Sequence, residues 1–248
     1  MLGVTDYILF GAFALFAAID FLAPARPLTA VRLWRIKGVL AAGAYWAVAF
    51  YSPFLWADLM SQARLVDGST WPFWIAAPVA LLAYQLGIYT WHRTLHGSDF
   101  LWRHLHQTHH SAERIDIWGA LYFHPLDALA FTFVGSFMLT VVLGVSPEAT
   151  LFAFGVSTVC ALFQHCNIRT PRWLGYFVAR PESHALHHGR GVHRFNYADI
   201  PVWDLVFGTF RNPKDFPAAN GFYDGASEEL GRLLIGRDVA GGPQPARA

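Results

Sequence analysis

The sequence predicts an all-α integral membrane protein with about four to five transmembrane helices and a histidine-rich helical cap on the cytoplasmic side. Three observations lead to this fold class. Of the 248 residues, 54% are hydrophobic and only 14% are charged, whereas soluble domains average about 25% charged residues. Several long stretches contain no charged residue. Eleven of the twelve histidines lie between His92 and His188, which indicates a metal site in a membrane protein.

Five charge-free runs are the candidate membrane spans. They cover residues 7–19, 38–57, 68–92, 128–147 and 149–168. A helix rises 1.5 Å per residue, so about 20 residues cross a hydrocarbon core of about 30 Å. Four runs reach that length, and the first does so if it continues to Leu22 with Asp20 near its polar end. Because only a turn around Ser146-Pro147-Glu148 separates the last two runs, we expect a tight helical hairpin.

The basic residues predict the orientation of these spans. Seventeen of the eighteen Lys and Arg residues fall in residues 23–37, in residues 92–127 or after residue 165, and only Arg64 lies between the second and third spans. By the positive-inside rule, the three basic segments are cytoplasmic, which places every histidine on that side or at its membrane edge. The tryptophans at predicted span ends, as expected of an aromatic belt, are Trp34, Trp56, Trp71 and Trp91.

We divide the chain into three parts. Residues 1–91 form transmembrane helices, residues 92–211 form a histidine-rich di-metal region that includes a transmembrane hairpin (126–165), and residues 212–248 form a cytoplasmic tail. The tail contains a short amphipathic segment, Ser227–Ile235, with Ser227 as a candidate N-cap. Two roles are equally open for this segment and the nearby aromatic residues: an amphipathic cover over the site, or core packing. Those aromatic residues are Phe207, Phe210 and Phe222.

Eight histidines form three clusters. The clusters are His92-x-x-x-His96, His106-x-x-His109-His110 and His184-x-x-His187-His188. Successive helical residues are about 100° apart, so His92 and His96 lie on one face and can hold one ion. In an H-x-x-H-H run the last two imidazoles diverge by about 100°, so the run can divide its ligands between two neighbouring ions. Eight imidazoles are more than one ion can use, and we predict a dinuclear site.

The other four histidines differ in how well they suit the role of metal ligand. His165 ends the fifth run at the cytoplasmic edge and is a further candidate ligand. His124 precedes Pro125, does not fit easily inside a helix, and is an even choice between ligand and non-ligand. His104 lies about 200° around the helix from the following histidine and is expected to point away. We expect His193, in a glycine-containing loop, beside the ligands or at the surface.

Carboxylates and cluster composition narrow the choice of metal. Imidazole suits zinc, copper, nickel and iron alike. The clusters lack both the H-E-x-x-H of zinc proteases and the Glu-x-x-His of carboxylate di-iron bundles, so an all-nitrogen di-iron centre accommodates them best. Six carboxylates near the clusters can accept the outer N–H of ligating rings, although a solvated surface charge is the simpler interpretation of each. They are Asp99, Asp116, Asp127, Glu182, Asp199 and Asp204.

The order of the clusters and the segments around them match the signatures of a known family. These segments are Trp91-His92-Arg93, Leu101-Trp102-Arg103, His109-His110-Ser111, Phe123-His124-Pro125-Leu126, Gln164-His165-Cys166-Asn167, Asn196-Tyr197 and Trp203-Asp204-Leu205-Val206-Phe207-Gly208-Thr209. The sequence thereby resembles the fatty acid hydroxylase superfamily, which includes sterol desaturases, methyl-sterol oxidases and lipid hydroxylases. The likeness is strong over residues 85–211 and loose over the early spans. Asp127 stands where members often have Glu.

The resemblance implies a membrane-bound non-haem di-iron oxygenase. Such an enzyme hydroxylates an unactivated C–H bond of a lipid (fatty acyl, sterol or related) with O₂ and externally supplied electrons. It implies that the eight clustered histidines bind two Fe ions, with His165 and His124 as further candidates and Zn possible in purified protein. Asp127, Asn196 and Asp204 are candidates for supporting the ligands. With no haem domain or G-x-G-x-x-G fingerprint in the sequence, a separate donor is expected, a reductase with ferredoxin or a b-type cytochrome.

Two other functions remain open. A lipid desaturase would use the same di-iron site, because hydroxylation and desaturation share the first hydrogen abstraction. A histidine-rich zinc-dependent membrane hydrolase belongs to a different class and would work without O₂. A transporter is disfavoured, because its ligands would lie near the middle of the bilayer.

Composition bears on partners and location. A net charge of +1 argues against a nucleic-acid partner. The excess of Arg over Lys, sixteen to two, and the frequent Ala favour a bacterial inner membrane, or the endoplasmic reticulum in a eukaryote. In either membrane, we expect the active site on the cytoplasmic side.

Overall fold

The computed structural model describes residues 3–242, and within that range the chain is helical, without strands. The predicted fold class is confirmed. The long helices are α1 (Val4–Leu22), α2 (Trp34–Tyr51), α4 (Phe73–Gly97), α7 (Pro125–Ser136) and α8 (Pro147–Gln164). The short α helices are α3 (Ala57–Gln62), α5 (Asp99–Leu101), α6 (Gln107–His110), α9 (Pro181–His187), α10 (Val202–Val206) and α11 (Leu230–Leu234). Segments of 3₁₀ or π helix are η1 (Ser52–Leu55), η2 (Trp102–His106), η3 (Ile117–Gly119), η4 (Phe137–Val142), η5 (Arg172–Tyr176) and η6 (Ala226–Glu228).

Four helical segments are long and apolar enough to cross a membrane. They are α1, α2 with η1, α4, and α7 with η4. Helix α8, which contains most of the fifth charge-free run, is 18 residues long, but its mean hydropathy is lower than that of these four segments. The 25 residues of α4 extend about 37 Å, which exceeds a hydrocarbon core of about 30 Å. The last turns of α4, with His92 and His96, can therefore reach the polar edge of the membrane.

Local sequence explains where the two helices of the hairpin begin. The hydroxyl of Ser146 accepts a hydrogen bond from the Ala149 N–H at 3.4 Å, and Pro147 takes the first helical position of α8. At the start of α7, the Nδ1 atom of His124 accepts a hydrogen bond from the Leu126 N–H at 3.1 Å. Because a residue before proline avoids the helical conformation, both X–Pro pairs set a helix start.

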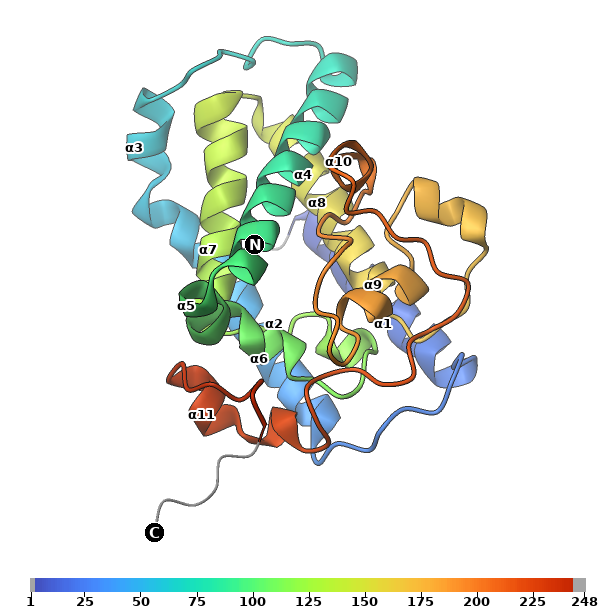
Figure 1. The fold of residues 1–248 in the computed structure, drawn as a ribbon. Helices are drawn as coiled ribbons and strands as arrows, with labels where there is room; N and C mark the ends of the chain where they lie inside the picture. Colours follow the sequence, from blue (N-terminus) through green and yellow to red (C-terminus); the bar gives the residue numbers. More distant parts are fainter. Residues whose placement is uncertain (1–2, 243–248) are drawn as a thin grey trace.

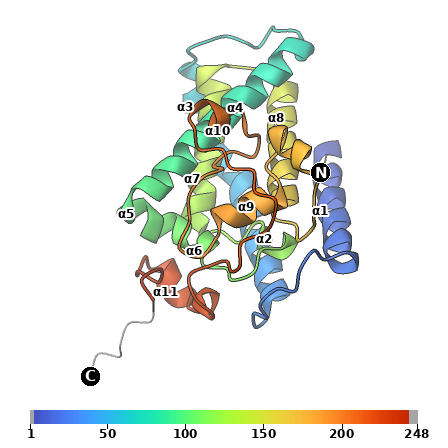
Figure 2. The ribbon, with the colours of Figure 1, turned by 45° about the vertical axis from the view of Figure 1, so that its right-hand side comes forward.

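The five long helices lie side by side in a bundle (Figures 1 and 2). Helix α8 packs against α4 and α1, and α7 packs against α2 and α4. Ala80 on α4 and Ala149 and Ala153 on α8 belong to one buried cluster, and such small side chains let two helices approach closely. The short helices α5, α6, α9 and α11 gather around the lower part of the bundle in Figure 1, and the α3–α4 connection lies at the upper end.

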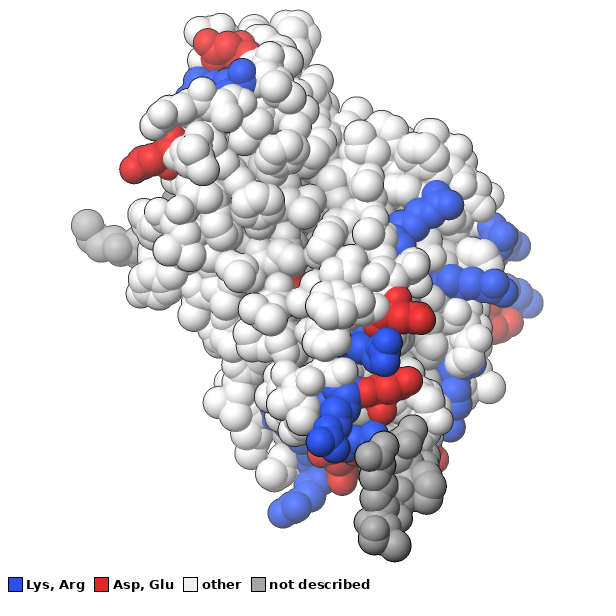
Figure 3. All heavy atoms as spheres, turned by 60° about the vertical axis from the view of Figure 1, so that its left-hand side comes forward, with Lys and Arg blue, Asp and Glu red and all other residues white. Residues whose placement is uncertain are grey.

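Charged side chains are unevenly distributed over the surface. Figure 3 shows blue and red atoms over the lower part of the molecule, an almost uncharged band above them, and charged atoms again at the upper tip. The apolar windows of α1 and α2 are only 6% and 11% buried, so these two helices present their side chains outward. A broad apolar band between two polar ends is what a membrane-spanning bundle requires.

Two expectations about single residues are wrong. Trp34 is only 3% exposed and its indole N–H donates to Asp116 Oδ1 at 2.8 Å, so it packs inside the protein and not in an aromatic belt. Ser227 does not cap a helix: its N–H and its hydroxyl both donate to the Glu113 carboxylate, and the N-cap of α11 is Glu229. Ser227 and Leu233 of this segment are buried in the core, whereas Leu234 and Ile235 are 42% and 65% exposed, so the segment combines core packing with an exposed apolar end.

Gly38 on α2 tests the packing of α2 against η3. A Cβ atom at Gly38 would collide with the backbone carbonyl oxygen of Trp118. Gly38→Ala should force the two elements apart and lower the free energy of unfolding by about 1–3 kcal/mol. Gly43→Ala on the same helix meets nothing within 4 Å and should be neutral or stabilise by up to about 1 kcal/mol. Chemical unfolding in detergent measures both variants, and equal values would contradict the close approach.

Candidate metal centre

Four segments of the chain bring nine histidines to one place below the bundle. The end of α4, the η2–α6 turn, the end of α8 and the short helix α9 contribute them. The nitrogens fall into two groups, in each of which one nitrogen per ring lies within 4.8 Å of the others. Group A contains His92, His96, His106, His110 and His187, and group B contains His109, His165, His184 and His188.

Each H-x-x-H-H run is divided between the two groups. The run on α6 sends His110 to group A and the adjacent His109 to group B. The run on α9 sends His187 to group A and the adjacent His188 to group B. Neighbouring residues on a helix diverge by about 100°, so two adjacent rings reach two different points. The structure thus brings all eight clustered histidines together and adds His165 to them.

In group A, all five Nε2 atoms are buried and have no hydrogen-bond partner among the described residues. Three of the rings are held through the opposite nitrogen. His92 Nδ1 lies 2.8 Å from the Tyr197 carbonyl oxygen, and His187 Nδ1 lies 2.7 Å from the Phe195 carbonyl oxygen. Because a carbonyl oxygen only accepts, each Nδ1 carries the proton and each Nε2 keeps a free lone pair. Five Nε2 atoms with no other partner among the described residues thus lie close together, as a metal ion requires of its ligands.

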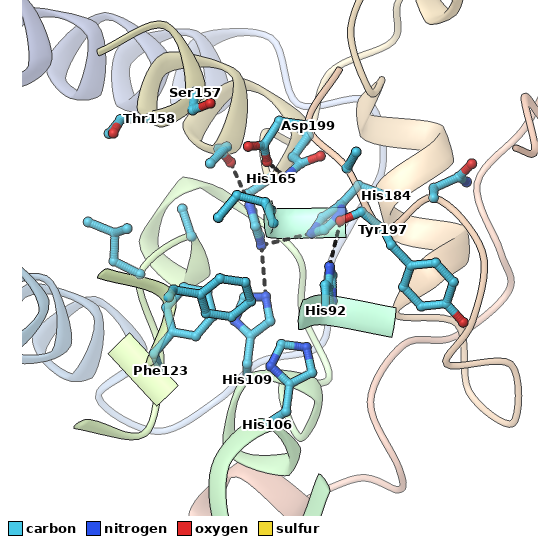
Figure 4. A pocket seen from close by; sticks show the side chains of 18 of the residues that line it. His92, His106, His109, Phe123, Ser157, Thr158, His165, His184, Tyr197 and Asp199 are labelled. Carbon is cyan, nitrogen blue, oxygen red and sulfur yellow. Dashed lines mark hydrogen bonds between the residues drawn. The ribbon is translucent and has the colours of Figure 1, made fainter. Parts of the chain in front are cut away.

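In group B, the Nε2 atoms face one another directly, and Figure 4 shows three of the four rings, those of His109, His165 and His184. His165 Nε2 lies 3.3 Å from His109 Nε2 and 3.0 Å from His184 Nε2, and His188 Nε2 lies 3.1 Å from His184 Nε2. His165 Nδ1 donates to the Ala161 carbonyl oxygen at 2.7 Å, so its Nε2 also presents a lone pair. One cation between the four rings would satisfy all of these nitrogens together.

Burial keeps the ligand rings neutral. It is the main reason that the pKa values of five rings are well below the usual value, and the neighbouring imidazoles lower them further. These are His109, His110, His184, His187 and His188. Neutral imidazole is the form that binds a metal. Nine nitrogen donors in two groups therefore fit two ions of iron, zinc, copper or nickel.

A strained loop supplies the two carbonyl groups. His193, Phe195 and Asn196 have positive φ angles of 40°, 72° and 50°, which cost such residues of order 1–3 kcal/mol each. Asp204 stabilises this loop, because its carboxylate accepts hydrogen bonds from the Tyr197 and Ala198 N–H groups, both at 2.9 Å. Local sequence carries no signal that these carbonyls would hold histidine rings, and sequence reasoning missed them.

Asn196 and Asp204 touch no ligand ring directly. The Asn196 amide donates to the Ser183 carbonyl and accepts from the Arg211 N–H. Both side chains act on the backbone of the strained loop, and through it on His92 and His187. Their expected support of the ligands is therefore indirect.

Three other histidines lie outside both groups. The two ring nitrogens of His124 contact the Leu126 N–H at 3.1 Å and the Leu234 carbonyl at 3.2 Å, so His124 caps α7 and is not brought to either group. His104 is half-buried and its ring stacks on Phe100, outside both groups, as the helical spacing predicts. His193 lies behind a ligand: its Nδ1 is 3.1 Å from His110 Nδ1, and burial lowers its pKa to about 4.

The carboxylates behave differently from the sequence-based interpretation as solvated surface charges. Five of the six are buried, and only Asp99 is exposed. Asp127 is the one that contacts a ligand ring, with Oδ2 2.7 Å from His106 Nδ1. Asp116 pairs with Arg114 and Glu182 with Arg180, and Asp199 binds Gln85 and Gln164. Their burial follows from long-range pairing that local sequence does not reveal.

A cavity lies against the histidines on the side of the membrane helices. We call it the inner cavity; it has a volume of about 80 Å³ open to a water-sized molecule. Tyr84 and Ile88 of α4, Phe131 of α7 and Ser157 of α8 form part of its wall, and His92, His106, His109, His165 and His184 reach its floor. The Phe123 ring stacks on the His109 ring with centroids 4.1 Å apart (Figure 4). The inner cavity therefore lies between five of the nine histidines and the side chains of the membrane helices.

Asp127 provides a test of ligand orientation. Asp127→Ala removes the acceptor of His106 Nδ1, so the ring can turn and take the other tautomer. Metal affinity should fall about 10–100-fold. Competition with a chelator, read by elemental analysis, measures this change, and Asp99→Ala is the matched control because Asp99 is exposed. An unchanged affinity in Asp127→Ala would contradict the role of this hydrogen bond.

The fold and the site together define a helical membrane protein with a histidine-lined centre suited to two metal ions. The family model for fatty acid hydroxylase matches residues 77–209, more than half of the chain. The protein belongs to the fatty acid hydroxylase family, and it is an oxidoreductase.

Three relatives illustrate the range of the family. Sphinganine C4-monooxygenase 1 of Arabidopsis thaliana is 28% identical over 71% of this chain and 69% of its own length. Very-long-chain aldehyde decarbonylase GL1-9 of Oryza sativa subsp. indica is 32% identical over 53% of this chain and 52% of its own. Ornithine lipid hydroxylase OlsE of Rhizobium tropici is 31% identical over 58% and 44%. The last two matches span about half of each relative. No solved structure matches.

Proposed function

We propose that the protein is a membrane-bound non-haem di-iron oxygenase that hydroxylates an unactivated C–H bond of a lipid, using O₂ and externally supplied electrons. One observation carries the proposal: nine imidazoles form two groups, and five of these rings border a cavity among membrane-spanning helices. Relatives named as a sphinganine monooxygenase and an ornithine lipid hydroxylase support oxidation of a lipid.

The chain's own residues would bind, orient and exclude water. Two iron ions, when bound, supply the activation of O₂ and the oxidation of the C–H bond, for which protein side chains have no equivalent. The Nε2 atoms of groups A and B hold the ions. The carbonyls of Tyr197 and Phe195 and the Asp127 carboxylate keep the outer protons on Nδ1 of three rings, so that Nε2 stays free. The apolar wall of the inner cavity keeps water out and holds the lipid beside the histidines.

The same proposal includes the membrane in which the protein lies and the source of its electrons. The histidines lie at the end of the bundle where the basic residues gather, which supports a site on the cytoplasmic side of a bacterial inner membrane or, in a eukaryote, of the endoplasmic reticulum. The electrons come from a separate donor, a reductase with ferredoxin or a b-type cytochrome.

Lipid mass spectrometry tests the function. Cells that express the wild type, His109→Ala or His104→Ala are grown with and without O₂, and their lipids are compared. A product that carries one more oxygen atom, and that requires both O₂ and His109, supports hydroxylation. His104→Ala, which removes a ring outside both groups, should form the same product.

The same experiment decides between the alternatives. A product that has lost two hydrogen atoms indicates a desaturase on the same site. A product that forms without O₂ favours a zinc-dependent hydrolase and overturns the proposal. Zinc in the purified protein does not decide the matter, because zinc binds such sites more tightly than ferrous iron.

A further inference from the structure

A second cavity adjoins the inner cavity within the membrane bundle. This outer groove has a volume of about 450 Å³ open to a water-sized molecule and lies between α1, α2, α7 and α8. Tyr45 and Tyr84 border both spaces, so the two meet at these rings. Phe50 and Leu151 on the wall of the outer groove are 64% and 51% exposed. The outer groove therefore opens on the surface that faces lipid.

The two spaces differ in the unpaired polar atoms on their walls. On the wall of the inner cavity, Gln164 is 5% exposed and its Oε1 atom has no hydrogen-bond partner within the described part of the chain. Asp199 lines the same space. The wall of the outer groove includes Asp6 beside aromatic and aliphatic side chains, and its Thr132 and Ser136 hydroxyls donate to carbonyls of their own helix. A molecule that occupies both spaces would place its polar end at the histidines and its apolar end in the groove.

The combined length of the two spaces indicates a long occupant. Both spaces are lined by α8, from Thr150 in the outer groove to His165 in the inner cavity. These residues span about 22 Å along the helix. That length exceeds half of a hydrocarbon core of about 30 Å, so the occupant reaches beyond one leaflet.

A glycine keeps the passage between the spaces open. A Cβ atom at Gly135 of α7 would lie 2.6 Å from a ring carbon of Tyr84, closer than real contacts allow. The missing side chain lets the Tyr84 ring lie against α7. Any larger residue at position 135 would push this ring toward the passage that it borders.

We infer that the inner cavity and the outer groove together hold one long, flexible alkyl chain of the lipid substrate. Its polar end lies near Gln164, and its tail passes Tyr45 and Tyr84 to the lipid-facing surface. The bond oxidised is then close to the polar end of the chain, a consequence that rests on the proposed function. A flexible chain can bend past the two tyrosine rings, whereas a rigid fused-ring sterol cannot.

Photo-crosslinking tests the binding without any need for activity. The purified full chain in detergent is irradiated with a long-chain fatty acid that carries a diazirine near its methyl end, and labelled peptides are mapped. We expect label on α7 and α8 residues of the outer groove, and competition by an unlabelled long-chain fatty acid. Label spread evenly over the exposed faces of α1 and α2, or preferential labelling of the groove by a photoreactive sterol, would overturn the inference.

Substitutions at two glycines test the passage. Gly135→Leu should reduce both the groove labelling and the O₂-dependent product of long chains by about tenfold or more, with unchanged metal content. Gly43→Leu, on a face of α2 where a Cβ meets nothing within 4 Å, is the matched control and should behave as the wild type. If Gly135→Leu fails to fold, Leu151→Trp at the exposed mouth of the groove should lower the same labelling.

The readouts separate failure of this inference from failure of the proposed function. Groove labelling that depends on Gly135, without any O₂-dependent product in the wild type, would uphold the binding site and reject the oxygenase. Product formation that Gly135→Leu and Leu151→Trp leave unchanged would reject the groove and leave the oxygenase intact. Oxidation at the methyl end of the chain would overturn the proposed orientation.

Discussion

Replacing either His187 or His184 with Ala should abolish formation of the oxidised lipid and lower the metal content of the purified protein. The two residues lie one turn apart on α9, but His187 belongs to group A and His184 to group B. Loss of a residue that merely supports a ligand costs about 10–100-fold in affinity or activity, so loss of a ligand should cost at least about 100-fold. Elemental analysis of iron and zinc per chain, together with lipid mass spectrometry, measures both effects.

His104→Ala is the control for these variants, because it removes an imidazole that lies outside both groups. It should keep the metal content and the product of the wild type. If His187→Ala retained a full complement of metal and full activity, the assignment of group A as a binding site would be wrong. The same outcome for His184→Ala would reject group B alone, so the pair tests the two groups separately.

Arg180→Met should give the largest loss of stability. The Arg180 side chain is 1% exposed, and its guanidinium lies 3.0 Å from the Glu182 carboxylate, which is equally buried. It also donates to the Thr170 carbonyl at 2.8 Å and to Asn212 Oδ1 at 2.6 Å. Removing it leaves the Glu182 charge buried without its cation, which costs about 3–5 kcal/mol. Chemical unfolding in detergent measures the loss, and since Arg180 directly precedes α9, metal retention should fall with it.

Two comparisons make the Arg180 prediction specific. Replacing both members of the pair, as in Arg180→Met with Glu182→Leu, should recover much of the lost free energy, because no buried charge is left alone. Arg169→Met removes one member of an ion pair whose side chains are 60% and 64% exposed, and should change stability by no more than about 1 kcal/mol. A loss in Arg180→Met as small as that in Arg169→Met would contradict the role of burial.

Features that depend on short-range geometry could be predicted from the sequence. The charge-free runs lie mainly in long helices of the structure. These helices could be predicted because both the absence of charged residues and the length of each run are properties of consecutive residues. The division of each H-x-x-H-H run follows from the angle between neighbouring helical residues, and the structure shows it at His109 and His110. His165 lies at the predicted cytoplasmic end of the fifth charge-free run, and this position was enough to predict it as a candidate ligand.

Features that depend on distant pairing could not be predicted. The carbonyls that hold His92 and His187 come from a loop with positive φ angles, and only the fold shows where that loop lies. From the sequence, Glu182 is most simply interpreted as a surface charge, and only the structure shows it buried in an ion pair with Arg180. His124 lies within a segment that resembles the family, which made it a candidate ligand. In the structure its ring nitrogens contact the Leu126 N–H at the start of α7 and the Leu234 carbonyl of α11, and residue spacing alone does not reveal these contacts.

The division of α6 and α9 between the two groups has a consequence for metal uptake. Each of these two helices contributes histidines to both groups. An ion bound at one group therefore orders the backbone of helices that also carry histidines of the other group. The second ion then meets donors that are already arranged and loses less conformational freedom on binding. Titration of metal-free protein should accordingly be steep, with few chains that carry a single ion, and limited iron would yield a mixture of fully loaded and empty molecules.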